Sequence, residues 1–354
     1  MGIPFIQKAR IGAYVGRKRF SFNGNGRFPL VLMLEPLFHC NLRCMGCGKI
    51  AHPEEILKKR MSAAECMGAI EECGAPVVSI AGGEPLLHPQ MAEIVKGFVS
   101  RKKFVYLCTN ALLVQERIHE FTPSPYLTFN VHLDALKDHH DARVGRKGVF
   151  ENAVKAIGLL VSQGFRVTTN TTLFKGETAE SAGELFDLLT SLQVEAMTVA
   201  SAFNYENAPD QAHFFNRDEA VQLFRSIFLK GRRRNWRFNH SSLYLDFLEG
   251  NQNYACTPWG NPTRNIFGWQ KPCYLINDGY ESSYRDLMKN NDWSKYGVGR
   301  DPRCTHCMLH SGFEPTAVMD SAKNPLKALK VYLHRNRSTT PVGADRPVYL
   351  PMKP

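Results

Sequence analysis

Residues 40–47 read Cys-Asn-Leu-Arg-Cys-Met-Gly-Cys, and the fold is best approached from this stretch. It follows an apolar run, Leu30–Leu37, that indicates a buried strand. Three thiolates so close together can hold three corners of one soft-metal site, because thiolates select zinc, copper(I) or iron–sulfur clusters over hard ions. His39 and His52 offer a fourth ligand for a structural zinc ion. An iron–sulfur cluster with one open iron is the sharper interpretation.

Outward from this loop, apolar runs alternate with helix-like stretches from about residue 30 to 235. The runs indicate six strands: Leu30–Leu37, Pro76–Ala81, Lys103–Thr109, Leu127–Leu133, Phe165–Thr171 and Val194–Ser201. The periodic segments between them indicate crossover helices: Ser62–Cys73, Met91–Val99, Ala111–Phe121, Val149–Gln163 and Thr178–Leu192. This series predicts an α/β fold, a partial (β/α)6 barrel with its site at the C-terminal ends of the strands.

Length and composition divide the chain further. Its 354 residues, 44% hydrophobic and 22% charged, are enough for a large core. We predict a basic amphipathic segment (1–28), the barrel (29–237), a cysteine-containing extension (238–323) and a basic, partly disordered tail (324–354). No stretch approaches the roughly 18 apolar residues of a membrane-spanning helix, and the N-terminus lacks a signal core. We therefore expect a cytoplasmic protein.

The net charge of +11 is concentrated in two places. The first 20 residues mix basic side chains with Ile3, Ile6, Ile11 and Tyr14 near one helical face; the basic ones are Lys8, Arg10, Arg17, Lys18 and Arg19. Such a helix either lies on the inner face of an anionic membrane or packs its apolar stripe on the barrel. A second run, 230–237, is typical of a solvated helix end, and we expect no nucleic-acid partner.

The C-x3-C-x2-C spacing of Cys40, Cys44 and Cys47, with Gly82-Gly83-Glu84-Pro85 after the second strand, resembles the radical S-adenosylmethionine (SAM) superfamily. The resemblance implies that the cysteines hold a 4Fe-4S cluster whose fourth iron binds SAM. It also implies that Gly82, Gly83, Glu84 and Pro85 bind the amino group of SAM. An aromatic residue often precedes the third cysteine of the family, near the adenine. Here that residue is Gly46, so we expect another side chain, such as Phe38, to pack on the adenine.

Polar residues end the next strands, where a barrel builds its site. Asn110, His132 and Asn170 are our candidates for holding the ribose and methionine of SAM, as such residues do in the family. Each is equally suited to capping the backbone at the strand end.

A narrower resemblance, to the adenosylhopane synthases of bacterial hopanoid biosynthesis, rests on Arg17–Ile50, Leu107–Leu112 and Phe129–Asp134 and extends into the C-terminal region. It implies a radical SAM adenosyltransferase that adds the 5′-deoxyadenosyl radical to the terminal alkene of diploptene, a membrane hydrocarbon. A flavodoxin- or ferredoxin-type electron donor and peripheral membrane contact follow from the same resemblance. For the apolar cavity wall we name Leu112, Leu113, Phe203, Phe214 and Phe215, each of which is equally an ordinary core residue.

Addition to an alkene leaves a carbon radical, and a thiol is a good hydrogen donor because its S–H bond is weak. Cys108 ends the third predicted strand, outside both cysteine groups, and we predict that it is the catalytic donor. A buried inert cysteine is the alternative.

Four later cysteines, Cys256, Cys273, Cys304 and Cys307, form a candidate second metal site. Four thiolates suit a second, fully ligated 4Fe-4S cluster or tetrahedral zinc, and His306 or His310 can replace one of them. This set also supports an alternative function, hydrogen abstraction from a peptide or small metabolite with the set as an auxiliary cluster. A non-catalytic metal- or nucleic-acid-binding protein is the remote alternative.

Overall fold

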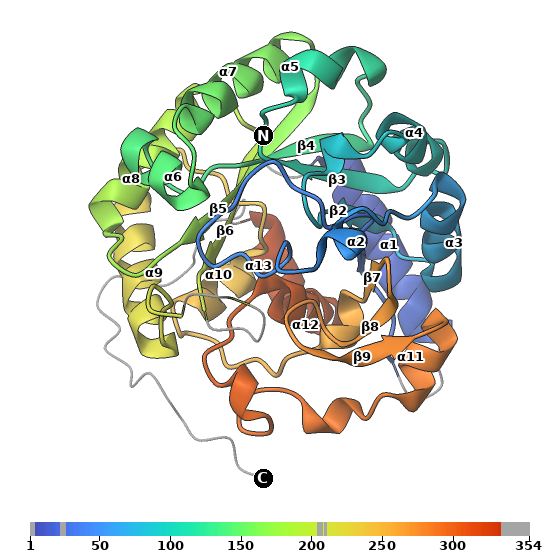
Figure 1. The fold of residues 1–354 in the computed structure, drawn as a ribbon. Helices are drawn as coiled ribbons and strands as arrows, with labels where there is room; N and C mark the ends of the chain where they lie inside the picture. Colours follow the sequence, from blue (N-terminus) through green and yellow to red (C-terminus); the bar gives the residue numbers. More distant parts are fainter. Residues whose placement is uncertain (1–3, 22–25, 204–207, 209–210, 334–354) are drawn as a thin grey trace.

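The computed structural model describes residues 4–21, 26–203, 208 and 211–333 (Figure 1). Within them, nine strands form one sheet in the order β6-β5-β4-β3-β2-β1-β7-β8-β9. The first six strands pair in parallel. They are β1 (Val31–Glu35), β2 (Val77–Ile80), β3 (Phe104–Thr109), β4 (Leu127–His132), β5 (Arg166–Leu173) and β6 (Ala196–Ser201). Each overlaps a predicted run, and the open sheet confirms the partial barrel.

Helices cover the outer side of the curved sheet (Figure 1). Their apolar faces meet the sheet in one core that includes Phe98, Phe129 and Phe186. Ser62 begins α3 with a capping box, and Gly74 ends it with a φ of +68°. The helices of this layer are α2 (Glu54–Leu57), α3 (Ala63–Cys73), α4 (Met91–Ser100), α5 (Val114–Arg117), α6 (Lys137–Val144), α7 (Val149–Ser162), α8 (Ala179–Ser191) and α9 (Arg217–Gly231), with 3-10 turns η1 (Pro85–Leu87) and η2 (Ile118–Glu120).

The basic run after α9 is held by the neighbouring helix. Lys230 Nζ lies 2.7 Å from Glu180, and Arg234 lies 3.3 Å from Asp187, both on α8. Trp236 is buried and donates to Asp187 at 2.8 Å. Trp236 is therefore a packing residue.

The C-terminal segment continues the barrel sheet, although its sequence predicted no strands. β7 (Thr263–Asn265) pairs in parallel with β1, and β8 (Gly268–Pro272) and β9 (Asn277–Glu281) follow antiparallel. These strands are three to five residues long and rich in Asn and Gly, which are weak strand signals. The remaining elements are α10 (Ser242–Leu248), α11 (Tyr284–Asn290), α12 (His310–Lys323), η3 (Pro258–Gly260), η4 (Trp293–Lys295) and η5 (Pro302–Cys304).

Terminal helices cover the far end of the barrel. α1 (Phe5–Ser21) packs Tyr14 and Val15 on Phe28 and Leu30, and α12 contacts both α1 and α13 (Pro325–Leu333). The predicted stripe is thus partly wrong: Tyr14 is buried, whereas Ile6 is exposed, and Ile3 lies outside the described residues. The predicted tail begins with α13, and residues 334–354 lie outside the description. Among the described helices, none has the length and apolarity to cross a bilayer.

Candidate active site

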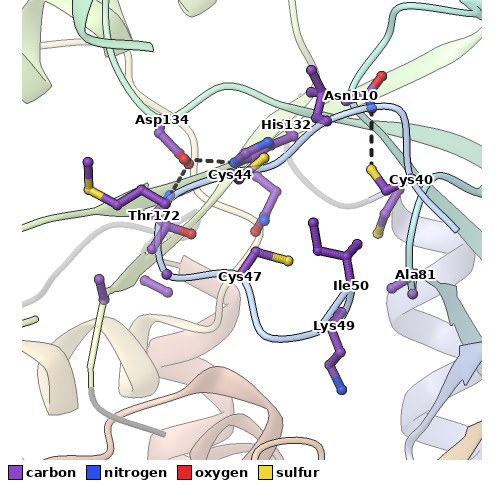
Figure 2. Close-up of a pocket in the computed structure, with 18 of the residues that line it drawn as sticks. Cys40, Cys44, Cys47, Lys49, Ile50, Ala81, Asn110, His132, Asp134 and Thr172 are labelled. Carbon is purple, nitrogen blue, oxygen red and sulfur yellow. Dashed lines mark hydrogen bonds and ion pairs between the residues drawn. The ribbon is translucent and has the colours of Figure 1, made fainter. Parts of the chain in front are cut away.

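The cysteine loop follows β1 and covers the C-terminal ends of the parallel strands (Figure 2). Cys40, Cys44 and Cys47 line a cavity of about 300 Å³, together with residues that end β2 to β6. Burial raises the pKa of Cys40 to about 11, and burial followed by the neighbouring Cys47 raises the pKa of Cys44. These thiols therefore hold their protons until a metal displaces them.

The arrangement fits a cluster better than a single ion. In the described part of the chain, no three His, Cys, Asp or Glu side chains converge closely enough for one metal ion. A tetrahedral zinc ion needs its sulfurs within about 4 Å of one another, whereas a 4Fe-4S cube spreads its ligands more widely. His39 is exposed and His52 stacks on Phe38 with centroids 4.9 Å apart; neither histidine lines the cavity. The alternative of three cysteines plus a histidine finds no support here.

The Gly82-Gly83 pair grips the cysteine loop. Gly83 N–H donates to Leu37 O and Glu84 N–H donates to His39 O, both at 2.9 Å. A Cβ atom on Gly83 would lie 1.9 Å from His39 O, and one on Gly82 would lie 2.3 Å from Leu37 O. We expected these glycines to bring backbone close to a ligand. In the structure they bring it close to the residues that precede Cys40.

Glu84 joins the ends of β2 and β3. Its buried carboxylate accepts hydrogen bonds from Thr109 Oγ1 at 2.8 Å, Asn110 N–H at 2.8 Å and Leu86 N–H at 3.0 Å. Burial raises the pKa of Glu84, and these hydrogen bonds oppose the shift. Glu84 also lines the cavity, whereas Pro85 is buried at the start of η1. Contact with the amino group of SAM stays a prediction.

The three strand-end candidates all line the cavity. The amide of Asn110 donates to Asn41 Oδ1 at 2.6 Å and lies 4.0 Å from Cys40 Sγ. His132 Nε2 lies 2.7 Å from Asp134 Oδ2 (Figure 2). Burial disfavours the charged imidazole, but Asp134 outweighs burial and raises the pKa of His132. Among the described residues, no side-chain hydrogen bond like those of Asn110 and His132 holds the side chain of Asn170, which lines the cavity.

Asp134 also lines the cavity; it directly follows the fourth predicted strand but was not among our candidates for holding SAM. Its Oδ1 accepts the Thr172 N–H at 2.7 Å, so one carboxylate ties the end of β5 to His132 on β4. Although burial opposes ionisation, His132 lowers the pKa of Asp134. The available signal was its place two residues after His132, at the end of a predicted strand.

Phe214 stands where the family's aromatic residue is missing. A Cβ atom on Gly46, which has a φ of +70°, would lie 2.8 Å from Phe214 Cε1. Phe214 lines the cavity, and Phe38 does not. The expectation that Phe38 packs on adenine is therefore wrong, because its ring is buried against His52 and Phe267.

A second cavity, of about 390 Å³, adjoins the first inside the barrel. The two share seven lining residues: Ala81, Cys108, Asn170, Thr172, Ala200, Tyr274 and Leu309. Cys108 Sγ lies 3.5 Å from Asn130 Nδ2 and 3.6 Å from Ser79 Oγ. Burial raises the pKa of Cys108, so it stands at the junction as a thiol.

One wall of the second cavity is apolar, formed by Ile11, Leu30, Val31, Met33, Val77 and Val318. Opposite it, polar side chains bond one another: Asn130 accepts from Thr168 at 3.0 Å, and Asn239 accepts from Tyr106 at 3.3 Å. Of the apolar wall residues we predicted, Phe203 and Phe214 line the first cavity. Leu112, Leu113 and Phe215 line neither cavity; they pack in the hydrophobic core.

The four C-terminal cysteines come together from separate segments. Burial raises the pKa of Cys256, and the nearby thiolates of the other three raise it further. Backbone N–H groups donate to the sulfurs of Cys273, Cys304 and Cys307. Gly312 leaves room for this group, because a Cβ atom there would lie 2.5 Å from Cys256 Sγ.

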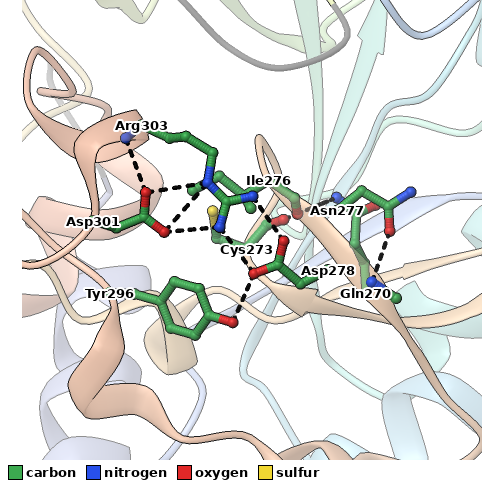
Figure 3. A network of polar contacts seen from close by, with 9 residues as sticks. Gln270, Cys273, Ile276, Asn277, Asp278, Tyr296, Asp301 and Arg303 are labelled. Atoms are coloured by element: carbon green, nitrogen blue, oxygen red, sulfur yellow. Dashed lines mark hydrogen bonds and ion pairs between the residues drawn. The ribbon is translucent and has the colours of Figure 1, made fainter.

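Arg303 fastens the segment of Cys304 to the β8–β9 hairpin that holds Cys273 (Figure 3). Its guanidinium lies 2.7 Å from both Asp278 and Asp301, and Tyr296 donates to Asp278 at 2.8 Å. The two histidines we considered as ligands have other contacts. His306 accepts from Arg217 N–H at 3.4 Å, and His310 lines the second cavity, where burial lowers its pKa to about 3.

Lys49 links the two cysteine groups, and we did not single it out from the sequence. Its Nζ lies 2.9 Å from the buried Glu35 at the end of β1. It also donates to Tyr274 O at 3.2 Å and lies 4.1 Å from the centre of the Tyr274 ring. The residue after Cys273 is thereby joined to the loop of Cys47.

Comparison with known proteins agrees with this geometry. Residues 34–189 match the radical SAM superfamily model, and residues 197–331 match a domain of unknown function (DUF3463). The chain is 26% identical over 328 residues to the antilisterial bacteriocin subtilosin biosynthesis protein AlbA of Bacillus subtilis, covering 85% of this chain and 69% of AlbA. It is 25% identical over 155 residues to the GTP 3′,8-cyclase of Clostridium perfringens, which covers 42% of this chain. That match spans 48% of the cyclase, about half its length.

Solved structures show the same fold. Streptococcus suis SuiB bound to its precursor peptide SuiA superposes with a TM-score of 0.63 at 16% identity, covering 90% of this chain and 77% of SuiB. SuiB bound to S-adenosylmethionine gives a TM-score of 0.60 at 17% identity, covering 78% of this chain and 67% of that one. Residues 34–189, which include the three cysteines that face the cavity, thus match the radical SAM superfamily, whose enzymes use a 4Fe-4S cluster and S-adenosylmethionine.

Proposed function

We propose that this enzyme adds the 5′-deoxyadenosyl group to the terminal alkene of diploptene to give adenosylhopane. The observation that carries the proposal is the position of Cys108, a protonated thiol where the first cavity meets the second. Cys40, Cys44 and Cys47 would hold the cluster, and bound SAM supplies the adenosyl radical. Asn110, His132, Asn170 and the Gly82–Pro85 motif would orient SAM.

The chain's own part in the reaction is to place the alkene and to finish the product. The apolar wall of the second cavity suits a hydrocarbon, because apolar groups bind where they leave water. After addition forms the new C–C bond, Cys108 gives a hydrogen atom to the substrate carbon radical. One electron from a flavodoxin- or ferredoxin-type donor and one proton then restore the thiol. Asn130 and Ser79 keep Cys108 Sγ at the junction.

The test is anaerobic incubation of the reconstituted enzyme with SAM, reductant and diploptene, with mass analysis of the lipid. We expect a saturated adenosyl-hydrocarbon adduct, and its absence would sink the proposal. With Cys108→Ala, SAM is still consumed but saturated adduct falls to background. Cys66→Ala, which removes a buried thiol that lines neither cavity and leaves Cys108 in place, should retain the product. Unaltered yield from Cys108→Ala would remove the donor role.

Hydrogen abstraction from a peptide is the second candidate, and the likeness to AlbA over most of the chain favours it. Deuterium from a labelled substrate would then appear in 5′-deoxyadenosine, and no covalent adenosyl adduct would form. The same incubation therefore separates the two functions by its product: a covalent adenosyl adduct for addition, or deuterated 5′-deoxyadenosine for hydrogen abstraction.

For the C-terminal cysteines we propose a second, fully ligated 4Fe-4S cluster, with zinc as the alternative. The support is four partly buried cysteines that lie near one another, three of which accept backbone N–H bonds, as sulfurs around iron do. About eight irons per chain and no zinc is the expected metal content. About four irons with one zinc would assign the zinc alternative.

A further inference from the structure

Exposed apolar side chains gather on the two terminal helices. Four of the six large apolar residues that stand exposed in the described chain belong to α1 or α13. Phe5 is 75% exposed, Ile6 44%, Leu326 78% and Leu329 52%. Both helices contact α12. Single exposed apolar residues are ordinary, but a cluster marks a site of contact.

The charge on these helices has one sign. α1 holds Lys8, Arg10, Arg17 and Lys18 and has no acidic residue between Phe5 and Ser21. The described α13, Pro325–Leu333, also lacks acidic residues and includes Lys327. Surface helices of water-soluble proteins usually carry both signs. A basic helix with exposed Phe and Ile suits the headgroup region of an anionic bilayer, where the apolar groups insert and the cations meet phosphate.

The second cavity is lined in part by α1 and α12. Gln7 and Ile11 of α1 line it, as do Pro315 and Val318 of α12. Ile11 and Val318 are only half-buried, and both pack against the cluster of Tyr14 and Val15. Its inner end is at Cys108, next to the cysteine loop. An apolar wall thus extends from the terminal helices into the barrel.

We propose that α1 and α13 form a face that docks on an anionic bilayer, and that the membrane hydrocarbon enters the barrel between α1 and α12. Its alkene then reaches Cys108 from the end of the barrel opposite to the cysteine loop. The route rests on the function proposed above, whereas docking does not. Two observations favour an anionic lipid surface as the partner of this face. The basic side chains of α1 complement its negative charge, and α1 also lines the second cavity.

Docking is tested by flotation of the full chain with vesicles of phosphatidylcholine, with and without phosphatidylglycerol. We expect binding that needs phosphatidylglycerol and weakens in high salt. The double change Phe5→Asp and Ile6→Asp should lower it at least about tenfold, since two apolar anchors are lost. Leu229→Asp on α9, at a side chain that is 55% exposed, is the matched control and should bind normally. Absence of binding, or an equal loss in the control, would overturn docking.

The entry route is tested with Ile11→Trp, which narrows the gap between α1 and α12. Adenosylation of diploptene in vesicles should fall about tenfold or more, because the alkene no longer reaches the radical. Vesicle binding and the 5′-deoxyadenosine released without hydrocarbon should not change. Leu229→Trp, at an exposed side chain on α9 outside the docking face, should adenosylate normally. Unchanged adenosylation by Ile11→Trp would overturn the route, and an unmodified enzyme that makes no adduct would instead sink the proposed function.

Discussion

Cys40, Cys44 and Cys47 lie within one loop, whereas Cys256, Cys273, Cys304 and Cys307 come from distant segments. The loop group faces a cavity and has three thiols, which leaves room for a ligand from outside. The C-terminal group has four partly buried cysteines that line neither cavity, and three of them accept backbone N–H bonds. We therefore expect two tasks: chemistry at the loop group, and structure or electron transfer at the C-terminal group.

The largest expected effect comes from Cys44→Ala. Removing one of three ligands should abolish formation of 5′-deoxyadenosine, because the cluster that binds SAM is lost. Iron should fall by about four per chain. Anaerobic reconstitution, iron analysis and chromatography of the nucleoside check this. Full cleavage of SAM by this variant would contradict the assignment of the SAM-binding cluster to the loop group.

Cys304→Ala should act differently. About four irons should again be lost, but SAM cleavage should persist at a measurable rate because the loop group is intact. Retention of all eight irons would show that the C-terminal group is not a cluster. Cys66→Ala, which removes a buried thiol outside both groups, is the control and should keep the iron content.

Asp134→Asn tests the strand ends that support the loop group. The pKa of His132 is raised above its ordinary 6.5. Protonated His132 therefore makes its full contribution to the free energy of unfolding below pH 6.5, and this contribution is lost as the pH rises through the raised pKa. The pKa of Asp134 is lowered from 3.8. Ionised Asp134 therefore makes its full contribution to the free energy of unfolding above pH 3.8, and this contribution is lost as the pH falls through the lowered pKa. The variant should lose about 1.5–3 kcal/mol of unfolding free energy near pH 5, and less at alkaline pH. Urea unfolding across this range checks it; a loss that does not depend on pH contradicts the ion pair.

Phe214→Ala should have the smallest effect. If the ring packs on the adenine, its removal weakens SAM binding by up to about tenfold. Phe215→Ala, at a neighbouring buried ring in the core, should cost stability but leave SAM affinity unchanged. Equilibrium binding of SAM to the reconstituted variants measures both. Equal affinity for both variants would remove Phe214 from the site.

The six barrel strands and the loop group were predictable because their signals are local. Parallel strands are buried on both faces and form continuous apolar runs. Cys40, Cys44 and Cys47 lie within one short loop, so their spacing can be read directly from the sequence. By contrast, β7 to β9 are short, and their place beside β1 depends on pairing with a strand more than 200 residues earlier. Such pairing leaves no periodic trace in the sequence.

Site residues divide in the same way. Asn110, His132 and Asn170 were found because strand ends meet at one edge of a parallel sheet. Phe214 was predicted as a residue of the cavity wall, but its place beside Gly46 was not, because that contact joins distant parts of the chain. Lys49 was missed because its role depends on a carbonyl beyond Cys273. Phe38 was misplaced because its neighbours in space, His52 and Phe267, come from other parts of the chain.

Lys49 has a consequence for how the molecule is made. Its hydrogen bond to Tyr274 O joins residues that are 225 positions apart. Lys49, which pairs with the buried Glu35, can therefore form this bond only after most of the chain has left the ribosome. A nascent barrel lacking residue 274 holds its metal-binding loop by fewer bonds than the finished protein does. We therefore expect the loop to retain iron best after the second half of the polypeptide has folded.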